Sequence, residues 1–305
     1  MTEEQYRKNL NVPCDNADVI LDTDAYNEID DQFAIAYLLR SSERLHTVGI
    51  CAAPFINPKS KTPEDGMEKS FQEIQKVLAL AEPLEATPPV FRGSSCFLPD
   101  ECTPVISDAA TFMASEAEKY SPEHPLYIVA IGAPTNVASA FLLNPGAMRE
   151  NTVIVCLGGH AIHWPDNTEF NLQQDVAAAR IIFGSGAPFV QIPCNGVVSA
   201  FRTTEPELRY WLAGRNKLAD YLVANTVKEA ESYAAGKPWS RPIWDVTAVG
   251  WLLNDNERFM RSMRIRAPIP QYDFKYSYSP NRPEINYVYH INRDALYADL
   301  FEKLV

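Results

Sequence analysis

Six short, nearly continuous apolar runs alternate with helical patterns along the first two thirds of the chain. The runs are DVILDT (18–23), LHTVGIC (45–51), PVFRG (89–93), LYIVAIG (126–132), NTVIVCLGG (151–159) and PFVQIP (188–193). Such runs are typical of strands that are buried on both faces. The helical patterns cover 31–40, about 64–81, 106–119, 135–143 and 175–184. This alternation predicts an α/β fold with a mostly parallel central sheet flanked by helices.

The last third of the chain has a different pattern. Helical stretches are predicted at 204–214, 216–236 and 244–255, followed by a β-rich stretch at 262–291 and a closing helix at 293–304. We expect this helical C-terminal part to cap a site at the sheet edge. No repeat, low-complexity tract or linker interrupts the chain, so residues 1–305 are predicted to form a single domain.

Composition narrows the classes of molecule that the protein is expected to bind and where in the cell it is expected to lie. The net charge of -12 disfavours nucleic acid and anionic membranes, which attract basic surfaces, and favours a cation or a neutral small molecule. There is no run of about 18 apolar residues and no apolar signal core near the N-terminus. The six cysteines form no C-x-x-C pair, as in reduced cytosolic proteins. We therefore expect a cytoplasmic protein.

An acidic cluster interrupts the first strand–helix junction. In VILDTDAYNEIDDQFAIAYLL (19–39), Asp22, Asp24, Glu28, Asp30 and Asp31 lie within ten positions. A helix cap explains Asp30 or Asp31, but not the other acids. Carboxylates held this close repel one another unless a proton or a cation intervenes. Because all the candidate ligands are oxygens, the pattern predicts a hard cation, calcium or magnesium.

Two familiar metal motifs do not fit this cluster. An EF-hand loop starting at Asp22 would need Gly and Glu where the chain has Asn27 and Phe33. A D-x-D phosphotransferase of the haloacid-dehalogenase kind would have Thr or Val at the position of Tyr26. A magnesium phosphatase of the D-x-D type is kept as a rival hypothesis, and it predicts a nearby Lys and Ser or Thr for the phosphate.

Three later stretches also lie at predicted strand ends. IGAPTN (131–136) is either a plain strand-to-helix turn or a turn that leaves a carbonyl free for a cation. The loop in GGHAIHWPDNTEFNLQQDVAAA carries His160, His163, Glu169 and Asn171, and long polar loops in such places are often functional. Asp245 precedes an apolar helix and, taken alone, would be read as an N-cap.

Taken together and in order, these motifs resemble the inosine-uridine preferring nucleoside hydrolases, calcium enzymes that cleave the N-glycosidic bond of ribonucleosides. The family's D-x-D-P-G-x-D-D appears as DTDAYNEIDD, its LGPLTN as IGAPTN, and its GG…AEFN…D…AA as GGHAIHWPDNTEFNLQQDVAAA. Its late His-Asp appears as Trp244-Asp245. The resemblance covers most of the chain and implies hydrolysis of a nucleoside to ribose and base.

The resemblance also implies individual roles. Calcium would be bound by Asp24, Asp31, the backbone carbonyl of Thr135 and Asp245, and Asp24 would also accept a proton from the attacking water. The ribose hydroxyls would be held by Asp30, Glu169 and Asn171. Asp22 would support these ligands without touching the metal. Family members are usually homodimers or homotetramers, so a homo-oligomer is expected.

Departures from the family concern the base-binding half of the site. The acidic loop is two residues longer, so Tyr26, Asn27 or Glu28 would reach the site. Trp244 replaces the His that helps the base to leave, and it either stacks on the base or only packs. His163 aligns with a sugar-binding Asn and would contact sugar or supply the missing acid. Other candidates are Asn57, Tyr233 and Trp239.

Beside nucleoside hydrolysis and the rival phosphatase, two further alternatives remain. One is a nucleoside- or ribose-binding homologue with weak or no turnover, which loss of the family His would favour. The other is a hydrolase of a non-standard ribosyl N-glycoside. The base of the substrate is left open.

Overall fold

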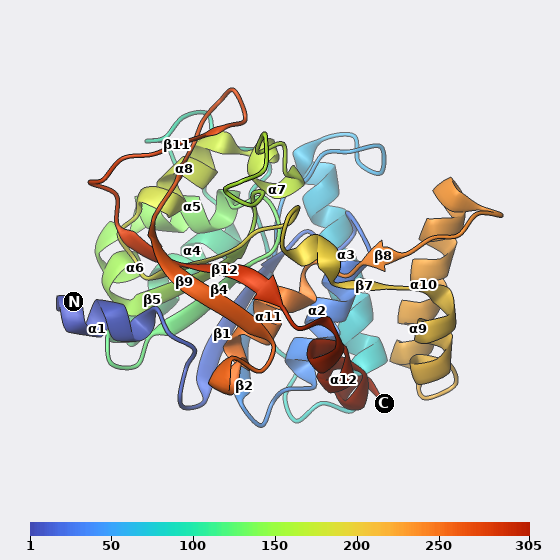
Figure 1. Cartoon of the computed structure of the whole chain (residues 1–305). Coiled ribbons are helices and arrows are strands. Elements are labelled where there is room, and N and C mark those ends of the chain that lie inside the picture. The colour runs from blue at the N-terminus through green and yellow to red at the C-terminus, as the bar shows by residue number, and fades with distance from the viewer.

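The computed structural model describes residues 1–305 and contains an eight-stranded sheet with helices on both faces (Figure 1). The strand order is β3-β2-β1-β4-β5-β6-β12-β9. Neighbouring strands run parallel, except for β12 and β9 at one edge, which run antiparallel. The predicted mostly parallel α/β sheet is confirmed.

All six strands predicted in the first two thirds are present. The strands of the large sheet are β1 Ala17–Thr23, β2 Leu45–Ala52, β3 Val90–Arg92, β4 Leu126–Ala130, β5 Thr152–Leu157, β6 Phe189–Ile192, β9 Met260–Arg266 and β12 Glu284–Ile291. Two short antiparallel ribbons pair β7 Arg202–Thr203 with β8 Arg241–Pro242 and β10 Ile269–Pro270 with β11 Tyr276–Ser277. The last of the long strands, β12, adds parallel to β6, so the C-terminal part completes the sheet begun by the N-terminal part.

The helices follow the predicted pattern with three additions. They are α1 Glu3–Asn9, α2 Asp30–Leu39, α3 Pro63–Ala81, α4 Asp108–Glu116, α5 Thr135–Leu143, α6 Pro145–Asn151, α7 Phe170–Gln174, α8 Val176–Gly184, α9 Glu205–Leu212, α10 Lys217–Ala234, α11 Val246–Leu252 and α12 Arg293–Leu304, with 3-10 turns at Ala117–Lys119, Val198–Ala200 and Asp255–Glu257. Helices α1, α6 and α7 were not expected. Helices α1 and α6 have seven residues and α7 has five, and each depends on a side-chain cap, from Thr2, Asn144 and Glu169 respectively. Such short helices give little periodic signal.

Alternate residues of each central strand face opposite layers. In β1, Val19 and Leu21 pack in the core formed with α2, α3, α11 and α12, whereas Ile20 packs in the core formed with α4, α5 and α8. This explains why the strands read as continuous apolar runs, because both faces are covered. No helix is both long and apolar enough to span a lipid bilayer.

The carboxyl ends of the parallel strands meet at one edge of the sheet. Polar loops follow β1, β4, β5 and β6 there, and ligands of open parallel sheets bind at such edges. From the C-terminal third, α11 packs against α2, and α10 packs against α2 and α3. The fold therefore brings the start of α11 next to the loop that follows β1.

Candidate active site

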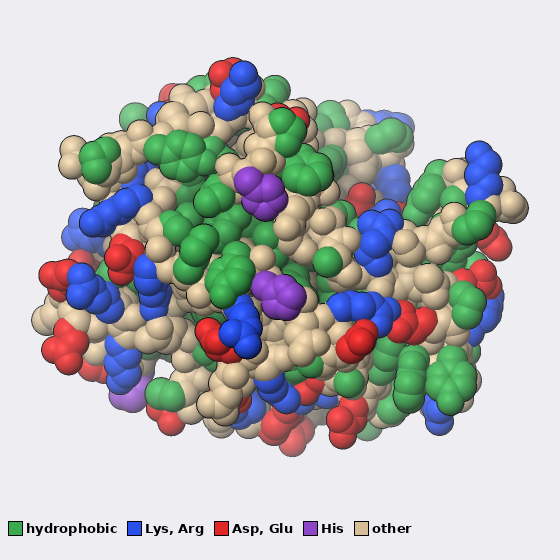
Figure 2. Space-filling view, viewed as in Figure 1, with side chains coloured by type: hydrophobic (Ala, Val, Ile, Leu, Met, Phe, Trp, Pro, Cys, Tyr) green, Lys and Arg blue, Asp and Glu red, His purple; other side chains and the backbone are tan.

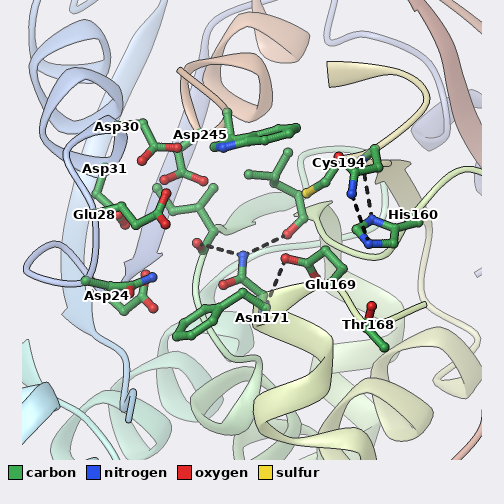
Figure 3. A pocket seen from close by; sticks show the side chains of 16 residues that line it. Asp24, Glu28, Asp30, Asp31, His160, Thr168, Glu169, Asn171, Cys194 and Asp245 are labelled. Carbon is green, nitrogen blue, oxygen red and sulfur yellow. Dashed lines mark hydrogen bonds between the residues drawn. The ribbon is translucent and has the colours of Figure 1, made fainter. Parts of the chain in front are cut away.

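A cavity of about 290 Å³ lies at the carboxyl edge of the sheet (Figure 3). Residues after β1, β4, β5, β6 and β8 all contribute to its walls. They are Asp24, Asn27, Glu28, Asp30, Asp31, Ile131, Leu157, His160, Thr168, Glu169, Phe170, Asn171, Cys194, Asn195, Trp244 and Asp245. One wall, called the acidic wall below, carries Asp24, Glu28, Asp30, Asp31 and Asp245. The opposite wall carries Glu169, Asn171 and His160 (Figure 3).

The β1–α2 loop places the acids on the first wall. Asp30 and Asp31 occupy the first turn of α2, but the N-cap is Ile29, which makes no capping hydrogen bond through its side chain. The hydroxyl of Thr23 at the end of β1 donates a 2.5 Å hydrogen bond to Asp31 Oδ1. That bond fixes the Asp31 carboxylate between strand and helix, so the capping explanation does not account for its position.

Asp245 joins the same wall from the distant end of the chain. It occupies the N-cap position of α11 and makes no capping hydrogen bond. One carboxylate oxygen from each of Asp30, Asp31 and Asp245 lies within 4.8 Å of the other two. Asp24 borders the same cavity, although its oxygens lie outside this tight group of three.

Burial changes the acidity of the cluster. Burial, followed by repulsion from Asp31 and Asp30, raises the pKa of Asp24 well above its usual range. Burial and repulsion from Asp30 and Asp31 do the same to the pKa of Asp245. Burial raises the pKa of Asp31 to about 6, even though the Thr23 hydroxyl opposes the shift. Bringing these carboxylates together therefore favours proton uptake unless a cation offsets their charge.

The donor set fits a hard divalent cation. Asp24 Oδ2 and Asp30 Oδ1 are buried and have no hydrogen-bond partner. Buried polar atoms without partners are rare and call for an ion, a ligand or a water. Carboxylate oxygens on three sides of a small space are what calcium and magnesium bind.

Asp22 lies behind this wall. Its side chain is fully buried, and Asn136 Nδ2 donates a 2.8 Å hydrogen bond to Asp22 Oδ1. Burial raises the pKa of Asp22 to about 7. Asp22 does not line the cavity, in keeping with the supporting position expected for it.

Glu169 and Asn171 are fixed rigidly on the opposite wall. The Glu169 carboxylate caps α7 and accepts hydrogen bonds from the backbone N–H groups of Gly159, Asn171 and Leu172 at 2.9, 2.9 and 3.0 Å. The Asn171 side-chain amide donates to the carbonyls of Ile131 and Leu157 at 3.1 and 3.3 Å. Hydrogen bonds to the backbone therefore hold both side chains in place on the wall opposite the acids.

Thr135 begins α5 beside this space. Its hydroxyl donates a 2.7 Å hydrogen bond to Asp175 Oδ2, and its side chain does not line the cavity. The turn before it comes close to Asp24, because a Cβ on Gly132 would lie 3.1 Å from the Asp24 backbone nitrogen and 2.9 Å from Ala53 Cβ. Glycine at 132 lets the β4–α5 turn pack against the acidic loop. A metal contact from the Thr135 carbonyl stays a prediction.

The structure does not bring His163 into the cavity. His163 is exposed, and its ring lies against Gly196, where an added Cβ would be 3.2 Å from His163 Nε2. His160, three residues earlier, lines the cavity and is buried. Its Nδ1 accepts a hydrogen bond from the Asn195 backbone N–H at 3.3 Å. Burial lowers the pKa of His160.

Trp244 lines the cavity beside Asp245 and also packs partly against the core. It is therefore both a packing residue and a wall of the site. Among the loop residues, Asn27 and Glu28 line the cavity, whereas Tyr26 is 40% exposed outside it. Asn57 only reaches Asn27, donating to its Oδ1 at 2.7 Å.

Tyr233 and Trp239 do not line the cavity. Tyr233 is exposed on α10, and Trp239 packs partly against the core. Sequence reasoning did not select Asn195 and Cys194, which follow β6 and border the site. Their position directly after a predicted strand was the available signal, as it was for His160 after Gly158-Gly159.

The fold and the cavity define an α/β protein with an acidic site at the carboxyl edge of its sheet. A family model described as inosine-uridine preferring nucleoside hydrolase matches residues 19–297. The chain belongs to this family, and the resemblance read from the motifs is confirmed.

Curated relatives and solved structures agree with this assignment. The pyrimidine-specific ribonucleoside hydrolase RihA of Citrobacter koseri is 32% identical over 162 residues, which are 52% of this chain and 49% of the relative. The match thus spans about half the length of that relative. A plant nucleoside hydrolase, PpNRh1, superposes with a TM-score of 0.74 at 21% identity, covering 94% of this chain and 98% of that one. A purine-preferring ribonucleoside hydrolase from Gardnerella vaginalis superposes with a TM-score of 0.72 at 19% identity, covering 94% and 98%. At these identities the two structures show the shared fold alone.

Proposed function

We propose that the protein hydrolyses the N-glycosidic bond of a ribonucleoside, giving ribose and a free base, with calcium at the acidic wall. The observation that carries this proposal is the cavity in which buried, unpartnered carboxylate oxygens face Glu169 and Asn171. The family membership supports the same reaction.

The acids suit this chemistry. Departure of a base from C1′ of ribose builds positive charge on the sugar ring. Carboxylates around the sugar stabilise that charge, and the low-dielectric cavity strengthens the effect. Asp30, Glu169 and Asn171 would hold sugar hydroxyls, and Asp24 would accept the proton of the attacking water. Asp31, Asp245, Asp24 and the Thr135 carbonyl would hold calcium, which would orient the water and sugar and make the water more acidic.

The group that helps the base to leave is the open part of the proposal. Trp244 can stack on the base, and His160 is the imidazole that borders the cavity. We propose that His160, rather than His163, is the candidate proton donor, because His163 lies outside the cavity wall. Of the earlier rivals, the phosphatase has no support, since no Lys or Arg lines the cavity.

Release of free ribose tests the proposal directly. The panel contains purine and pyrimidine ribosides, nicotinamide riboside and p-nitrophenyl riboside, each with calcium and with chelator. Calcium-dependent release from a natural nucleoside establishes the reaction and names the base. Release from nicotinamide riboside alone indicates a non-standard ribosyl N-glycoside as substrate. Release from the p-nitrophenyl compound alone indicates that the ribose half of the site works but that no base in the panel fits. Bound ribose without release from any substrate supports the binding homologue.

A homo-oligomer is part of the same proposal. Met263 on β9 and Tyr289 on β12 are exposed apolar side chains, and Figure 2 shows hydrophobic side chains on the face of the molecule over these strands. Exposed apolar patches of this kind are often buried in interfaces. Light scattering in solution tests it, and a monomeric mass at micromolar concentration would contradict it.

A further inference from the structure

Arg241 is a largely buried cation that lies against the acidic wall. It lies in β8, three residues before Trp244, and its side chain is only 13% exposed. β8 pairs with β7, with Thr203 opposite Arg241, which pins the backbone of this segment. A guanidinium buried to this degree needs carboxylate partners.

Three carboxylates, two from the β1–α2 junction and one from α10, surround the Arg241 guanidinium. Nη2 contacts Glu28 of the acidic loop closely, lies 3.2 Å from Glu229 Oε1 of α10, and lies 4.0 Å from Asp30 Oδ1. Among Asp22, Asp24, Asp30, Asp31 and Asp245, only Asp30 has an ion pair, and its partner is Arg241. The positive charge is therefore directed at one acid of the wall.

Asp30 has two available roles in this geometry. Its oxygen lies within 4.8 Å of oxygens of Asp31 and Asp245, close enough for all three to bind one cation. Asp30 Oδ1 is also buried and accepts no hydrogen bond, so it is free to accept one from a sugar hydroxyl. The carboxylates alone do not decide between these roles.

We propose that Arg241 is a positioning residue that assigns Asp30 to the sugar instead of to the cation. This inference rests on the proposed function. A guanidinium 4.0 Å from Asp30 Oδ1 repels a metal ion at that carboxylate, while the oxygen itself stays free to accept a hydroxyl hydrogen bond. Asp31 and Asp245, which have no such neighbour, remain the cation ligands.

Glu28 has a defined part in this arrangement. It lines the cavity and takes the closest contact with Arg241. Because Glu28 and Glu229 bind the guanidinium, Arg241 stays 4.0 Å from Asp30 and makes no hydrogen bond to it. Glu28, which belongs to the longer acidic loop, thus leaves the Asp30 oxygen free to bind the substrate.

A double-mutant cycle on Arg241 and Asp30, read by calorimetric titration of the chelated protein with calcium chloride, tests the assignment. Asp30→Asn in the wild-type background should change the calcium dissociation constant by less than about threefold, because Asp30 is not a ligand. Arg241→Gln should leave calcium binding equal or tighter and weaken ribose binding. In the Arg241→Gln background, Asp30→Asn should weaken calcium binding by about tenfold or more, since Asp30 is then recruited as a ligand.

Two outcomes would overturn the assignment: an equal effect of Asp30→Asn in both backgrounds, or a parallel loss of calcium and ribose binding in Arg241→Gln. Arg209→Gln, which removes an exposed arginine paired with Glu205 on α9, is the matched control. Arg241→Lys keeps the positive charge and serves if Arg241→Gln folds poorly. In the Arg241→Lys background, Asp30→Asn should have as small an effect on calcium binding as it has in the wild-type background. Wild-type protein that binds calcium but hydrolyses no nucleoside would contradict the proposed function alone, because the calcium cycle needs no turnover.

Discussion

Asn136 Nδ2 donates a 2.8 Å hydrogen bond to Asp22 Oδ1 and a second one, of 3.1 Å, to the carbonyl of Ala52. Asn136 Oδ1 in turn accepts hydrogen bonds from the backbone and hydroxyl of Ser94. One asparagine on α5 thereby ties together the ends of β1 and β2 and the segment after β3. Asp22 Oδ2 remains buried without a partner beneath the acidic wall.

Stability of the calcium-free protein should fall as the pH rises towards neutrality, in part because of Asp22. Its pKa is about 7 in the folded chain, against about 3.9 in an unfolded chain. The folded state therefore binds the proton more tightly than the unfolded state does. The contribution of Asp22 to the free energy of unfolding is fully present below about pH 4 and is lost as the pH rises through about 7. Urea unfolding in chelator between about pH 5 and 8 measures the slope.

Asp22→Asn should flatten that slope, because the titrating group is gone. The exposed Asp294→Asn, whose side chain is 88% exposed, should keep the wild-type slope. An Asp22→Asn protein with an unchanged pH slope would show that other acids dominate.

Asp24→Ala should abolish turnover and weaken calcium binding, yet cause little loss of stability in chelator. Asp24 carries a buried oxygen without a partner and is repelled by Asp31 and Asp30, so its removal relieves strain in the metal-free state. Ribose release and thermal melting in chelator measure the two effects. The exposed Glu231→Gln on α10 is the control, and a fully active Asp24→Ala protein would refute the mechanism.

Calcium should raise the melting temperature of the wild-type protein. A cation at a hundred times its dissociation constant adds about 2.7 kcal/mol, which corresponds to a shift of about 5 °C for a chain of this size. Differential scanning calorimetry with calcium, magnesium and chelator checks this. An equal or larger shift with magnesium would favour magnesium as the resident ion.

Replacing Trp244 and the two loop histidines should identify the group that assists base departure. Trp244→Ala should lower kcat about tenfold, the loss expected from one aromatic contact of about 1.4 kcal/mol, while Trp244→Phe keeps most of the rate. His160→Gln should lower kcat by about a hundredfold as a lost proton donor, and His163→Gln should not. The reverse order of the two histidine variants would restore His163 as the acid.

Glu169→Gln should destabilise the protein as well as impair sugar binding. The carboxylate accepts three backbone hydrogen bonds, and an amide NH₂ in its place would face N–H donors. The loss should be about 2 kcal/mol in the free energy of unfolding, as for a buried donor left without an acceptor. Denaturant unfolding measures it, with the exposed Glu231→Gln on α10 as the reference.

The layered fold and the location of the acids follow from local sequence patterns. Strands such as β1 and β5 are buried on both faces, so their apolar runs are visible locally, and the acids after β1 lie next to one of them. The order of the motifs was sufficient to identify the family. Helices α1, α6 and α7 escaped detection because each is short and depends on a cap, with little periodicity of its own.

The set of side chains that share the cavity depends on packing between segments that are distant in the sequence. His160 and His163 lie three residues apart in one polar loop, and the direction of each ring depends on contacts with Asn195 and Gly196 after β6. Arg241 lies 213 residues from Glu28, and no local pattern reveals that they touch. Local composition determines which faces are buried, whereas the pairing of charges across loops depends on how strands distant in sequence stack side by side.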